Sequence, residues 1–346
     1  MELEKNVSLQ HLHTFHSPVS TRYFIKVASL EELHAALERY QDLCKKEPDL
    51  PLLILGGGSN VVFSGDYRGL TIALGMKGIA VEHTTEEQVL LRVQAGEVWQ
   101  DLVEYTLRHN WGGLENLSLI PGNVGTSPMQ NIGAYGVEIK DVFERCTVLD
   151  LRTREIKTLT NSQCEFGYRE SIFKRKAKGQ YIILEVFFCL TRRNHPLKIS
   201  YGAIASELEA MGVVTPTIQQ VAQAVVRIRK SKLPDPNILG NAGSFFKNPT
   251  VESNVFSALT RQFPTIPSYP QPQGVKIPAG WLIEQCGWKG RRIGNVACHH
   301  LQALVLVNAT GEATGEEIYA FSQEIIDSVE SKFGITLERE VNIITS

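Results

Sequence analysis

Apolar residues recur at the three- and four-residue spacing of a helix in several stretches of the chain. Three of these stretches begin with Ser or Thr followed three residues later by Glu or Gln, which is the pattern of an N-terminal capping box. The last ends at Gly334, a residue suited to the left-handed backbone that closes many helices. The pattern predicts helices that begin at Ser29, Thr217 and Thr314, and two more over 98–109 and 279–286.

Short apolar runs between Gly, Pro and polar turns predict strands. They cover residues 52–55, 61–63, 89–93, 146–151, 155–159, 181–190, 304–307 and 337–344. Helices and strands alternate along the chain, which is typical of α/β or α+β proteins. Two strand-rich halves suggest one part for a cofactor and one for a substrate, with a boundary in residues 195–235.

Composition excludes several classes of protein. The 346 residues carry 35 Lys+Arg and 37 Asp+Glu, a net charge of −2, so neither nucleic acid nor an anionic membrane is expected as the main partner. The first residues include acidic side chains and no apolar core, so we expect no signal peptide and a cytoplasmic protein. Six cysteines at irregular spacing, without a CxxC pair, predict free buried thiols and no metal site.

Consecutive glycines follow the strand over 52–55, in the sequence Gly56-Gly57-Gly58-Ser59-Asn60. Such a turn directs backbone N–H groups at an anion such as a phosphate, although it serves equally well as a plain turn between strands. The spacing fits neither a Rossmann fingerprint nor a Walker A loop. A second stretch rich in Gly, Ser and Asn, over 120–136, favours a long ligand such as a dinucleotide held outside the Rossmann fold.

Three polar residues are candidates for chemistry, and each has an ordinary alternative. Arg169 suits a place where negative charge develops, but by itself a surface arginine paired with Glu170 is favoured. Ser244, in the Pro- and Gly-rich loop over 233–249, is either a positioned proton donor or a turn serine. Glu340 falls by alternation on the polar face of the last strand, so a solvated side chain is expected. The basic run over 227–232 is typical of a solvated helix end.

Taken together, six segments resemble the UDP-N-acetylenolpyruvoylglucosamine reductases of bacterial peptidoglycan synthesis. Tyrosines in LKISYGAI and SYPQ indicate the type I form of that family. The matching segments, in the family's order, are ILGGGSNVVF, GLENLSLIPGNVGTSPMQNIGAYGVE, CEFGYRESIFK, KLPDPNILGNAGSFFKNP, AGWLIEQCGWKG and LEREV.

The resemblance implies an α+β protein that joins an FAD-binding domain of the vanillyl-alcohol-oxidase (PCMH) type to a smaller α/β substrate domain. The implied parts are an N-terminal segment (1–20), the FAD-binding domain (21–195, with subdomains divided near 75), a connector with a tyrosine loop and a basic helix (196–232), the substrate domain (233–335) and a C-terminal strand (336–346). FAD would be reduced by NADPH. Its diphosphate would lie along 57–60 and 121–127, and its ring system against 127–136. The implied FAD-binding residues are Gly57, Gly58, Ser59, Asn60, Pro121, Gly122, Gly125, Thr126, Ser127, Ile132, Gly133 and Tyr135.

The implied reaction reduces the enolpyruvyl group of UDP-N-acetylglucosamine enolpyruvate to UDP-N-acetylmuramate, with hydride from flavin N5. Ser244 would donate the proton, and Arg169 and Glu340 would lie beside the substrate carboxylate. We expect Glu340 to act protonated or paired with Arg169, because an ionised carboxylate would oppose the charge that develops. The diphosphate would be bound by Tyr201, Lys232, Tyr269 and Lys289, and the uridine side by Asn248 and Gln302.

Two alternatives stay open at this point. An FAD oxidase that acts on an alcohol or sugar would consume O₂ without NADPH, and a nucleotide-binding module would not turn over at all. The expected partners are NADPH and the UDP-sugar, without nucleic acid, membrane or metal, and the expected state is a monomer.

Overall fold

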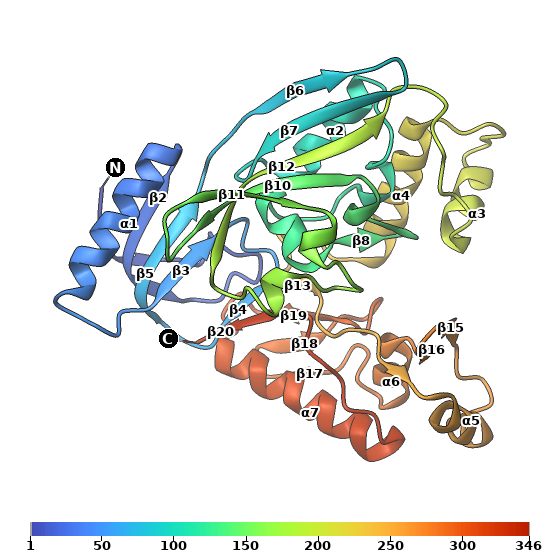
Figure 1. Cartoon of the computed structure of the whole chain (residues 1–346). Coiled ribbons are helices and arrows are strands. Elements are labelled where there is room, and N and C mark those ends of the chain that lie inside the picture. Colours follow the sequence, from blue (N-terminus) through green and yellow to red (C-terminus); the bar gives the residue numbers. More distant parts are fainter. Residues whose placement is uncertain (1, 346) are drawn as a thin grey trace. The chain divides into compact units, whose positions relative to one another are not determined.

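Two compact units make up the protein, each assembled from several stretches of the chain. The computed structural model describes residues 2–345 (Figure 1). The first unit holds residues 2–5, 23–57 and 69–231, and the second holds 6–22, 58–68 and 232–345. The second unit therefore takes in two early segments besides the C-terminal third. The domain limits expected from the sequence stay a prediction, because compactness does not show which ligand each part binds.

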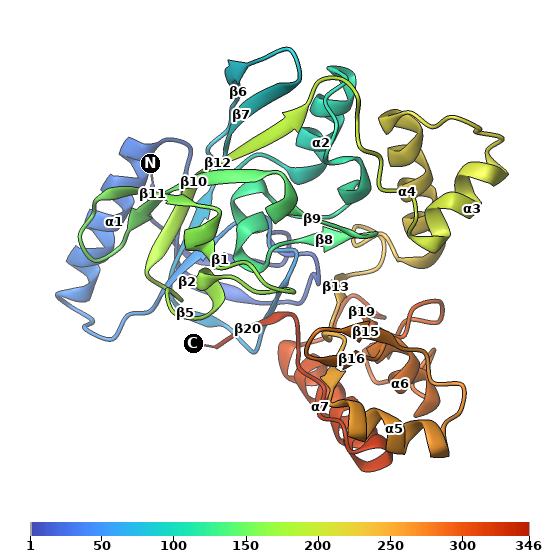
Figure 2. The same ribbon diagram turned by 45° about the vertical axis from the view of Figure 1, so that its right-hand side comes forward.

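Helices and strands alternate through both units, as the pattern predicted (Figure 2). The α-helices are α1 (Leu30–Cys44), α2 (Trp99–Arg108), α3 (Gly202–Ala210), α4 (Ile218–Lys232), α5 (Ser253–Gln262), α6 (Ala279–Gln285) and α7 (Gly315–Phe333). The strands are β1 (Glu4–Ser8), β2 (Ser20–Val27), β3 (Leu52–Leu55), β4 (Val61–Phe63), β5 (Tyr67–Leu74), β6 (Ile79–Thr84), β7 (Gln88–Gln94), β8 (Gly133–Ala134), β9 (Val137–Glu138), β10 (Phe143–Asp150), β11 (Ile156–Thr160), β12 (Tyr181–Thr191), β13 (Asn241–Ser244), β14 (Thr250–Val251), β15 (Tyr269–Gln271), β16 (Gly274–Lys276), β17 (Arg292–Ile293), β18 (Val296–Cys298), β19 (Val305–Asn308) and β20 (Asn342–Ile344).

Two sheets organise the first unit. An antiparallel sheet of order β11-β10-β12-β7-β6 packs one face into a core with α2, where Trp99 meets Phe188 edge to face at 5.9 Å between ring centroids. The indole N–H of Trp99 donates to the carbonyl of Leu117 at 2.9 Å, so the bulkiest side chain of this core is also satisfied as a donor. The other sheet has the order β1-β2-β5-β3, and Leu33 and Leu37 of α1 pack with its strands. The first of these cores includes Val124, with Ile120 and Ile132 packed against it, so it anchors the Gly-rich stretch over 120–136.

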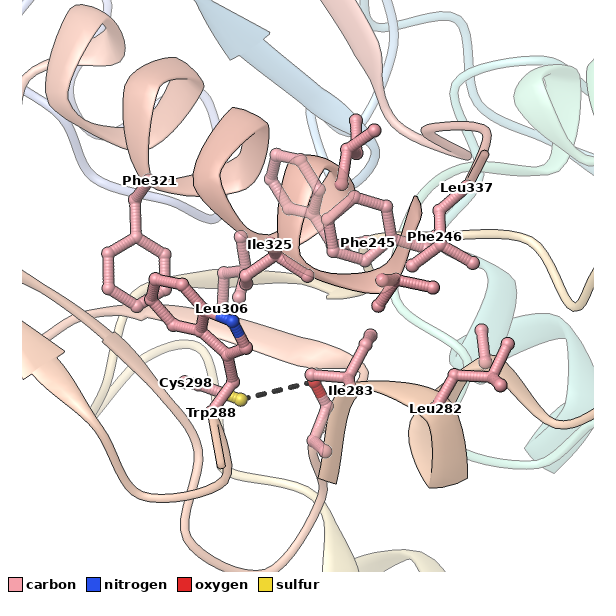
Figure 3. Packing of buried hydrophobic residues seen from close by; sticks show 14 of the residues in the cluster. Phe245, Phe246, Leu282, Ile283, Trp288, Cys298, Leu306, Phe321, Ile325 and Leu337 are labelled. Carbon is pink, nitrogen blue, oxygen red and sulfur yellow. Dashed lines mark hydrogen bonds between the residues drawn. The ribbon is translucent and has the colours of Figure 1, made fainter. Parts of the chain in front are cut away.

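A separate core supports the second unit. It combines sheet β13-β19-β18-β17 with α6 and with the apolar stripe of α7, and Figure 3 shows Phe245 and Phe246 among the side chains that fill it. Both phenylalanines are fully buried. They follow Ser244 directly, so packing of two large side chains fixes the backbone on which Ser244 stands. Strands β20 and β4 pair in parallel, with Asn342 opposite Val61.

The predicted helix caps are confirmed. The hydroxyl of Ser29 accepts the backbone N–H of Glu32 at 3.2 Å. Thr314 and Glu317 form a reciprocal capping box, and Gly334 closes α7 with φ of +67°. Local sequence signals therefore determine where these helices begin and end.

Three local predictions are corrected by the structure. Ser244 is not in a loop but at the end of β13, where it pairs with Val305 of β19. The predicted strand over 337–344 is regular only in β20, and Arg339 forms an isolated bridge with Phe246. The stretch over 120–136, whose Gly-, Ser- and Asn-rich sequence predicts little regular structure, contains a 3₁₀ helix, η2 (Val124–Gln130).

Solvation of Glu340 is the fourth expectation that fails, since this residue is only 8% exposed. Its backbone N–H donates to the carbonyl of Phe245 at 2.8 Å, and its own carbonyl accepts the side-chain amide of Asn60 at 3.3 Å. Segments distant in sequence therefore cover the face that alternation assigns to solvent. The cysteines are free, as predicted, with Cys146, Cys164 and Cys298 buried and the other three half-buried.

His13 gives the second unit a pH-dependent stability. The imidazole is 2% exposed, its Nε2 lies 3.2 Å from the carbonyl oxygen of Ser17, and its ring meets Phe63 edge to face. Burial lowers the pKa of His13 from 6.5 to about 4. In the unfolded chain this histidine binds a proton between pH 6.5 and 4, while in the folded protein it does not.

We expect the free energy of unfolding to fall by roughly 2 kcal/mol between pH 7 and pH 5 because of this one group. His13→Gln, which stays neutral, should lose that part of the pH dependence. Urea unfolding of both proteins at the two pH values measures the difference. Equal pH dependence in the variant and the parent would show that His13 is not the titrating group.

Candidate active site

Two Gly-rich stretches approach each other closely in the first unit. Gly57 follows β3, and a Cβ atom placed on it would lie 2.7 Å from Cα of Gly122 and 2.8 Å from Oδ1 of Asn123. A Cβ on Gly56 would lie 2.5 Å from Cγ2 of Thr126. Real side chains do not tolerate such distances, so only glycine permits the two backbones to meet here. The two glycine stretches from which the sequence predicts a dinucleotide therefore lie side by side, while the ligand itself stays a prediction.

Most hydroxyls of the second stretch are used within it. Thr126 and Ser127 each donate to a backbone carbonyl three residues earlier, at 2.7 Å. The N–H of Gly125 donates to the carbonyl of Ala95 at 2.9 Å, and a Cβ on Gly125 would lie 2.5 Å from the Cβ of Ala95. The stretch is thus held rigidly against the strand end of β7. We infer that it would contact a ligand through its backbone and shape more than through these hydroxyls.

Asn131 organises the segment that follows η2. It is buried, adopts a left-handed backbone with φ of +47°, and its amide donates to Glu138 at 3.0 Å and to the carbonyl of Gly167 at 2.9 Å. Arg169 lies on the neighbouring turn, itself with φ of +54°, and its guanidinium donates to the carbonyl of Gly133. Glu170 forms an ion pair with Arg175 at 3.0 Å. Arg169 is therefore anchored on β8, the region expected to face a flavin ring.

Arg229 is a further functional candidate. The sequence analysis assigned it, with the rest of the basic run over 227–232, to a solvated helix end. It is half-buried on α4 and interacts with the hydroxyl of Tyr135. Burial lowers the pKa of Arg229, and the charge of Arg169 lowers it further, while burial raises the pKa of Tyr135. Tyr135 also meets Tyr201 edge to face at 5.8 Å. Arg169, Arg229 and these two tyrosines thus form one cluster in the first unit.

The spacing of the apolar residues in α4 indicates that Arg229 is not fully solvated. The buried residues Ile218, Ala222 and Val225 of α4 are followed four residues later by Arg229, so this arginine continues the apolar stripe of the helix. Arg227, off the stripe, pairs instead with Glu207 at 3.6 Å. A cation at a stripe position indicates a buried charge rather than a solvated helix end.

The second unit brings together the end of the glycine turn, Ser244 and Glu340. Gly58 has φ of +61°, which suits glycine. The Ser59-Asn60 turn continues into β4, and the carbonyl of Asn60 accepts the N–H of Asn342 at 3.0 Å. Through Asn60 the turn is tied to the segment that carries Glu340, and through Phe245 that segment is tied to the strand that carries Ser244.

Ser244 itself is exposed, and among residues 2–345 its hydroxyl has no hydrogen-bond partner. The turn-serine alternative, in which the hydroxyl bonds its own backbone, is therefore not observed. A hydroxyl that stands on a rigid strand and is open to solvent is available to donate to a bound molecule.

The residues predicted to bind a nucleotide sugar fall into two groups. In the second unit, Asn248 accepts the N–H of Ala279 at 2.9 Å, and Oε1 of Gln302 would lie 3.3 Å from a Cβ on Gly280, so both lie at the start of α6. The others are more exposed. Lys232 ends α4, Tyr269 is 53% exposed on β15, Lys289 pairs with Glu284 at 3.0 Å, and Tyr201 precedes α3 in the first unit.

A groove of about 500 Å³ in the first unit lies elsewhere and contains none of the predicted site residues; Ser29, Lys77, Gln94 and Glu185 line its polar part. In the part of the chain that the structure describes, no group of three His, Cys, Asp or Glu is placed to hold a metal ion. Nor does any helix described here combine the length and the hydropathy needed to cross a membrane.

Two family models match this chain, one in its N-terminal half and one in its C-terminal third. The model of an FAD binding domain matches residues 21–159, and the model of the C-terminal domain of UDP-N-acetylenolpyruvoylglucosamine reductase matches residues 235–344. The chain thus joins a flavin-binding domain to a domain known from one class of reductases. The close-packed glycines at 57 and 122 fit this cofactor, because a dinucleotide needs backbone that approaches it without side chains.

Relatives match over the full length of the chain. A UDP-N-acetylenolpyruvoylglucosamine reductase of Flavobacterium johnsoniae is 48% identical over 99% of this chain and 100% of its own, and one of Pseudomonas putida is 44% identical over 99% of both. The chain belongs to the UDP-N-acetylenolpyruvoylglucosamine reductase family, which confirms the resemblance found in the sequence.

A solved structure supports the fold. The crystal structure of UDP-N-acetylenolpyruvylglucosamine reductase from Thermus caldophilus superposes with a TM-score of 0.67 over 99% of both chains, at 23% identity. The predicted fold class, an α+β protein with an FAD-binding domain and a smaller second domain, is confirmed.

Crowding at Gly57 can be tested directly. Gly57→Ala forces a Cβ into the backbone at Gly122, and such overpacking costs ~1–3 kcal/mol, so we expect FAD affinity to fall about tenfold or more. Titration of the flavin-free protein with FAD, followed by flavin fluorescence, measures the change. Gly65→Ala is the matched control, because a Cβ there meets nothing within 4 Å. Unchanged affinity in Gly57→Ala would show that the flavin does not depend on this approach.

Proposed function

We propose that this protein reduces the enolpyruvyl group of UDP-N-acetylglucosamine enolpyruvate with NADPH, giving UDP-N-acetylmuramate for peptidoglycan synthesis. The full-length similarity to reductases with this name supports the proposal. One structural observation carries its chemistry. The hydroxyl of Ser244 is exposed and has no hydrogen-bond partner among the described residues, and the next residue, Phe245, accepts the backbone N–H of the buried Glu340. FAD, when bound, supplies the two-electron carrier between NADPH and the enolpyruvyl group.

In this proposal Ser244 gives a proton to the α-carbon of the substrate. A serine hydroxyl is a weak acid, so its value lies in position more than in acidity. Strand β13 and the two buried phenylalanines that follow fix that position, which removes the entropy cost of aligning the donor.

The proposed reaction also builds up negative charge on the substrate, which the protein must stabilise. Hydride addition pushes electrons toward the carboxylate, so an enolate-like dianion develops. We assign to Arg169 the stabilisation of this charge, since its guanidinium is already anchored by the carbonyl of Gly133. Glu340 is assigned a place beside the same carboxylate. Its backbone is bonded on both sides, to Phe245 and to Asn60, so its side chain starts from a fixed point.

Recognition of the nucleotide sugar completes the proposal. Tyr201, Lys232, Tyr269 and Lys289 carry donors suited to phosphate oxygens, and all four side chains are exposed or half-buried. Asn248 and Gln302, which both lie near the start of α6, are assigned to the uridine side. We further propose that the enzyme acts as a monomer in the cytoplasm and that NADPH enters the same cleft before the UDP-sugar.

Separate measurement of the two half-reactions tests the role of Ser244. Ser244→Ala should leave flavin reduction by NADPH nearly unchanged and slow reoxidation by the UDP-sugar ~10²–10⁴-fold, the usual loss for a placed proton donor. Stopped-flow absorbance of the flavin resolves both steps. Ser257→Ala, which removes an exposed hydroxyl on α5, should alter neither. Equal impairment of both steps in Ser244→Ala would rule out the assignment.

A shared diphosphate site makes a second prediction. Lys232→Ala should raise KM about tenfold or more for both NADPH and the UDP-sugar, because each loses a charge-assisted bond to phosphate. Lys230→Ala removes a neighbouring exposed cation from α4 and should change neither KM. Steady-state kinetics with each substrate varied in turn measures both values. An increase for one substrate alone would contradict a shared site.

A further inference from the structure

An early segment of the chain, residues 12–15, lies in the second unit against both the glycine turn and strand β13. A Cβ on Gly58 would lie 2.1 Å from the carbonyl oxygen of Leu12, and a Cβ on Gly240 would lie 2.3 Å from that of Phe15. Both contacts are backbone against backbone. The segment is therefore packed between the turn assigned to the FAD diphosphate and the strand that ends at Ser244.

Thr14 makes the hydrogen bonds that join these two elements. Its N–H donates to the carbonyl of Gly58 at 3.1 Å. Its carbonyl accepts the N–H of Asn241 at 2.9 Å, and its hydroxyl donates to the carbonyl of Asn241 at 2.6 Å. One residue thus bonds the glycine turn on one side and, twice, the first residue of β13 on the other.

Surrounding contacts leave this arrangement little freedom. Phe15 is fully buried, meets Phe245 edge to face at 6.4 Å, and its carbonyl accepts the side-chain amide of Asn308 at 3.1 Å. The hydroxyl of Thr14 is the only side-chain atom of the segment in the described structure that bonds β13. Its loss would release one of the two bonds to Asn241 and leave the backbone bond to Gly58 intact.

We propose that Thr14 is a positioning residue: its hydroxyl fixes strand β13, and so the proton donor Ser244, at a set distance from the glycine turn that holds the cofactor diphosphate. In this role Thr14 acts through β13, by its bonds to Asn241, and not by contact with the reacting atoms. This inference rests on the role proposed for Ser244. Reactions that depend on alignment lose rate steeply when the donor shifts by about 1 Å, so a single anchoring bond has a kinetic effect beyond its stability.

Thr14→Val in the holoenzyme removes the hydroxyl and keeps the shape of the side chain. We expect flavin reoxidation by the UDP-sugar to slow ~10- to 100-fold, and flavin reduction by NADPH to stay within about twofold. Hydrogen–deuterium exchange should become faster in peptides that cover 239–246 and stay unchanged in α7. Thr14→Ser should restore both measurements. If Thr14→Val does not fold, Thr14→Ala removes the same hydroxyl with less bulk.

A double-mutant cycle separates positioning from general weakening. If Thr14 acts through Ser244, Thr14→Val should slow reoxidation less than about twofold in the Ser244→Ala background. The control is Thr106→Val, which deletes a buried hydroxyl bonded at 2.8 Å to Val103 on α2 and should leave both half-reactions unchanged. Equal slowing by Thr14→Val in both backgrounds, or unchanged exchange over 239–246, overturns the inference. An unimpaired Ser244→Ala enzyme overturns instead the role of Ser244 on which it rests.

Discussion

Close approach of backbone to backbone is the constraint on which the cofactor region depends. At Gly57 and Gly122 two stretches more than sixty residues apart in sequence come so near that no side chain fits between them. Such contact leaves peptide groups, rather than side chains, as the surface of the region. That surface suits a long, negatively charged dinucleotide, whose phosphates accept hydrogen bonds from N–H groups and need close access to them. The match of residues 21–159 to an FAD-binding domain is consistent with this geometry.

The second unit places its chemical groups by the same means, through backbone bonds between segments distant in sequence. Asn60 and Glu340 lie almost three hundred residues apart, yet hydrogen bonds join Glu340 both to Asn60 and to Phe245. The bond from Glu340 to Phe245 ties the segment of Glu340 to a residue that is packed in the core. Placement therefore depends on the cooperative stability of the whole unit, and the exposed side chain of Ser244 adds no stability of its own.

Local signals in the sequence predicted much of the fold. The caps at Ser29, Thr314 and Gly334 depend only on neighbouring residues, so their prediction succeeded. The assembly of the second unit from 6–22, 58–68 and the C-terminal part could not be predicted, because no local pattern records which distant segment a strand will pair with. The burial of Glu340 could not be predicted for the same reason. Alternation predicts on which side of a strand a side chain lies, but the segment that covers that side is distant in the sequence.

Arg229 was missed for a different reason. The spacing of the buried residues of α4 indicated that Arg229 is buried, but the basic run around it favoured a solvated side chain. A cation in a basic run is usually solvated, but at this position the helix stripe turns it toward Tyr135. Burial opposes its charge, yet guanidinium has so high an intrinsic pKa that it stays protonated at neutral pH. Burial of the charged guanidinium therefore destabilises the folded protein. The same burial places a positive charge near Arg169 before any anion binds. A preorganised charge of this kind needs no rearrangement when negative charge develops, which is the condition under which electrostatic stabilisation is most effective.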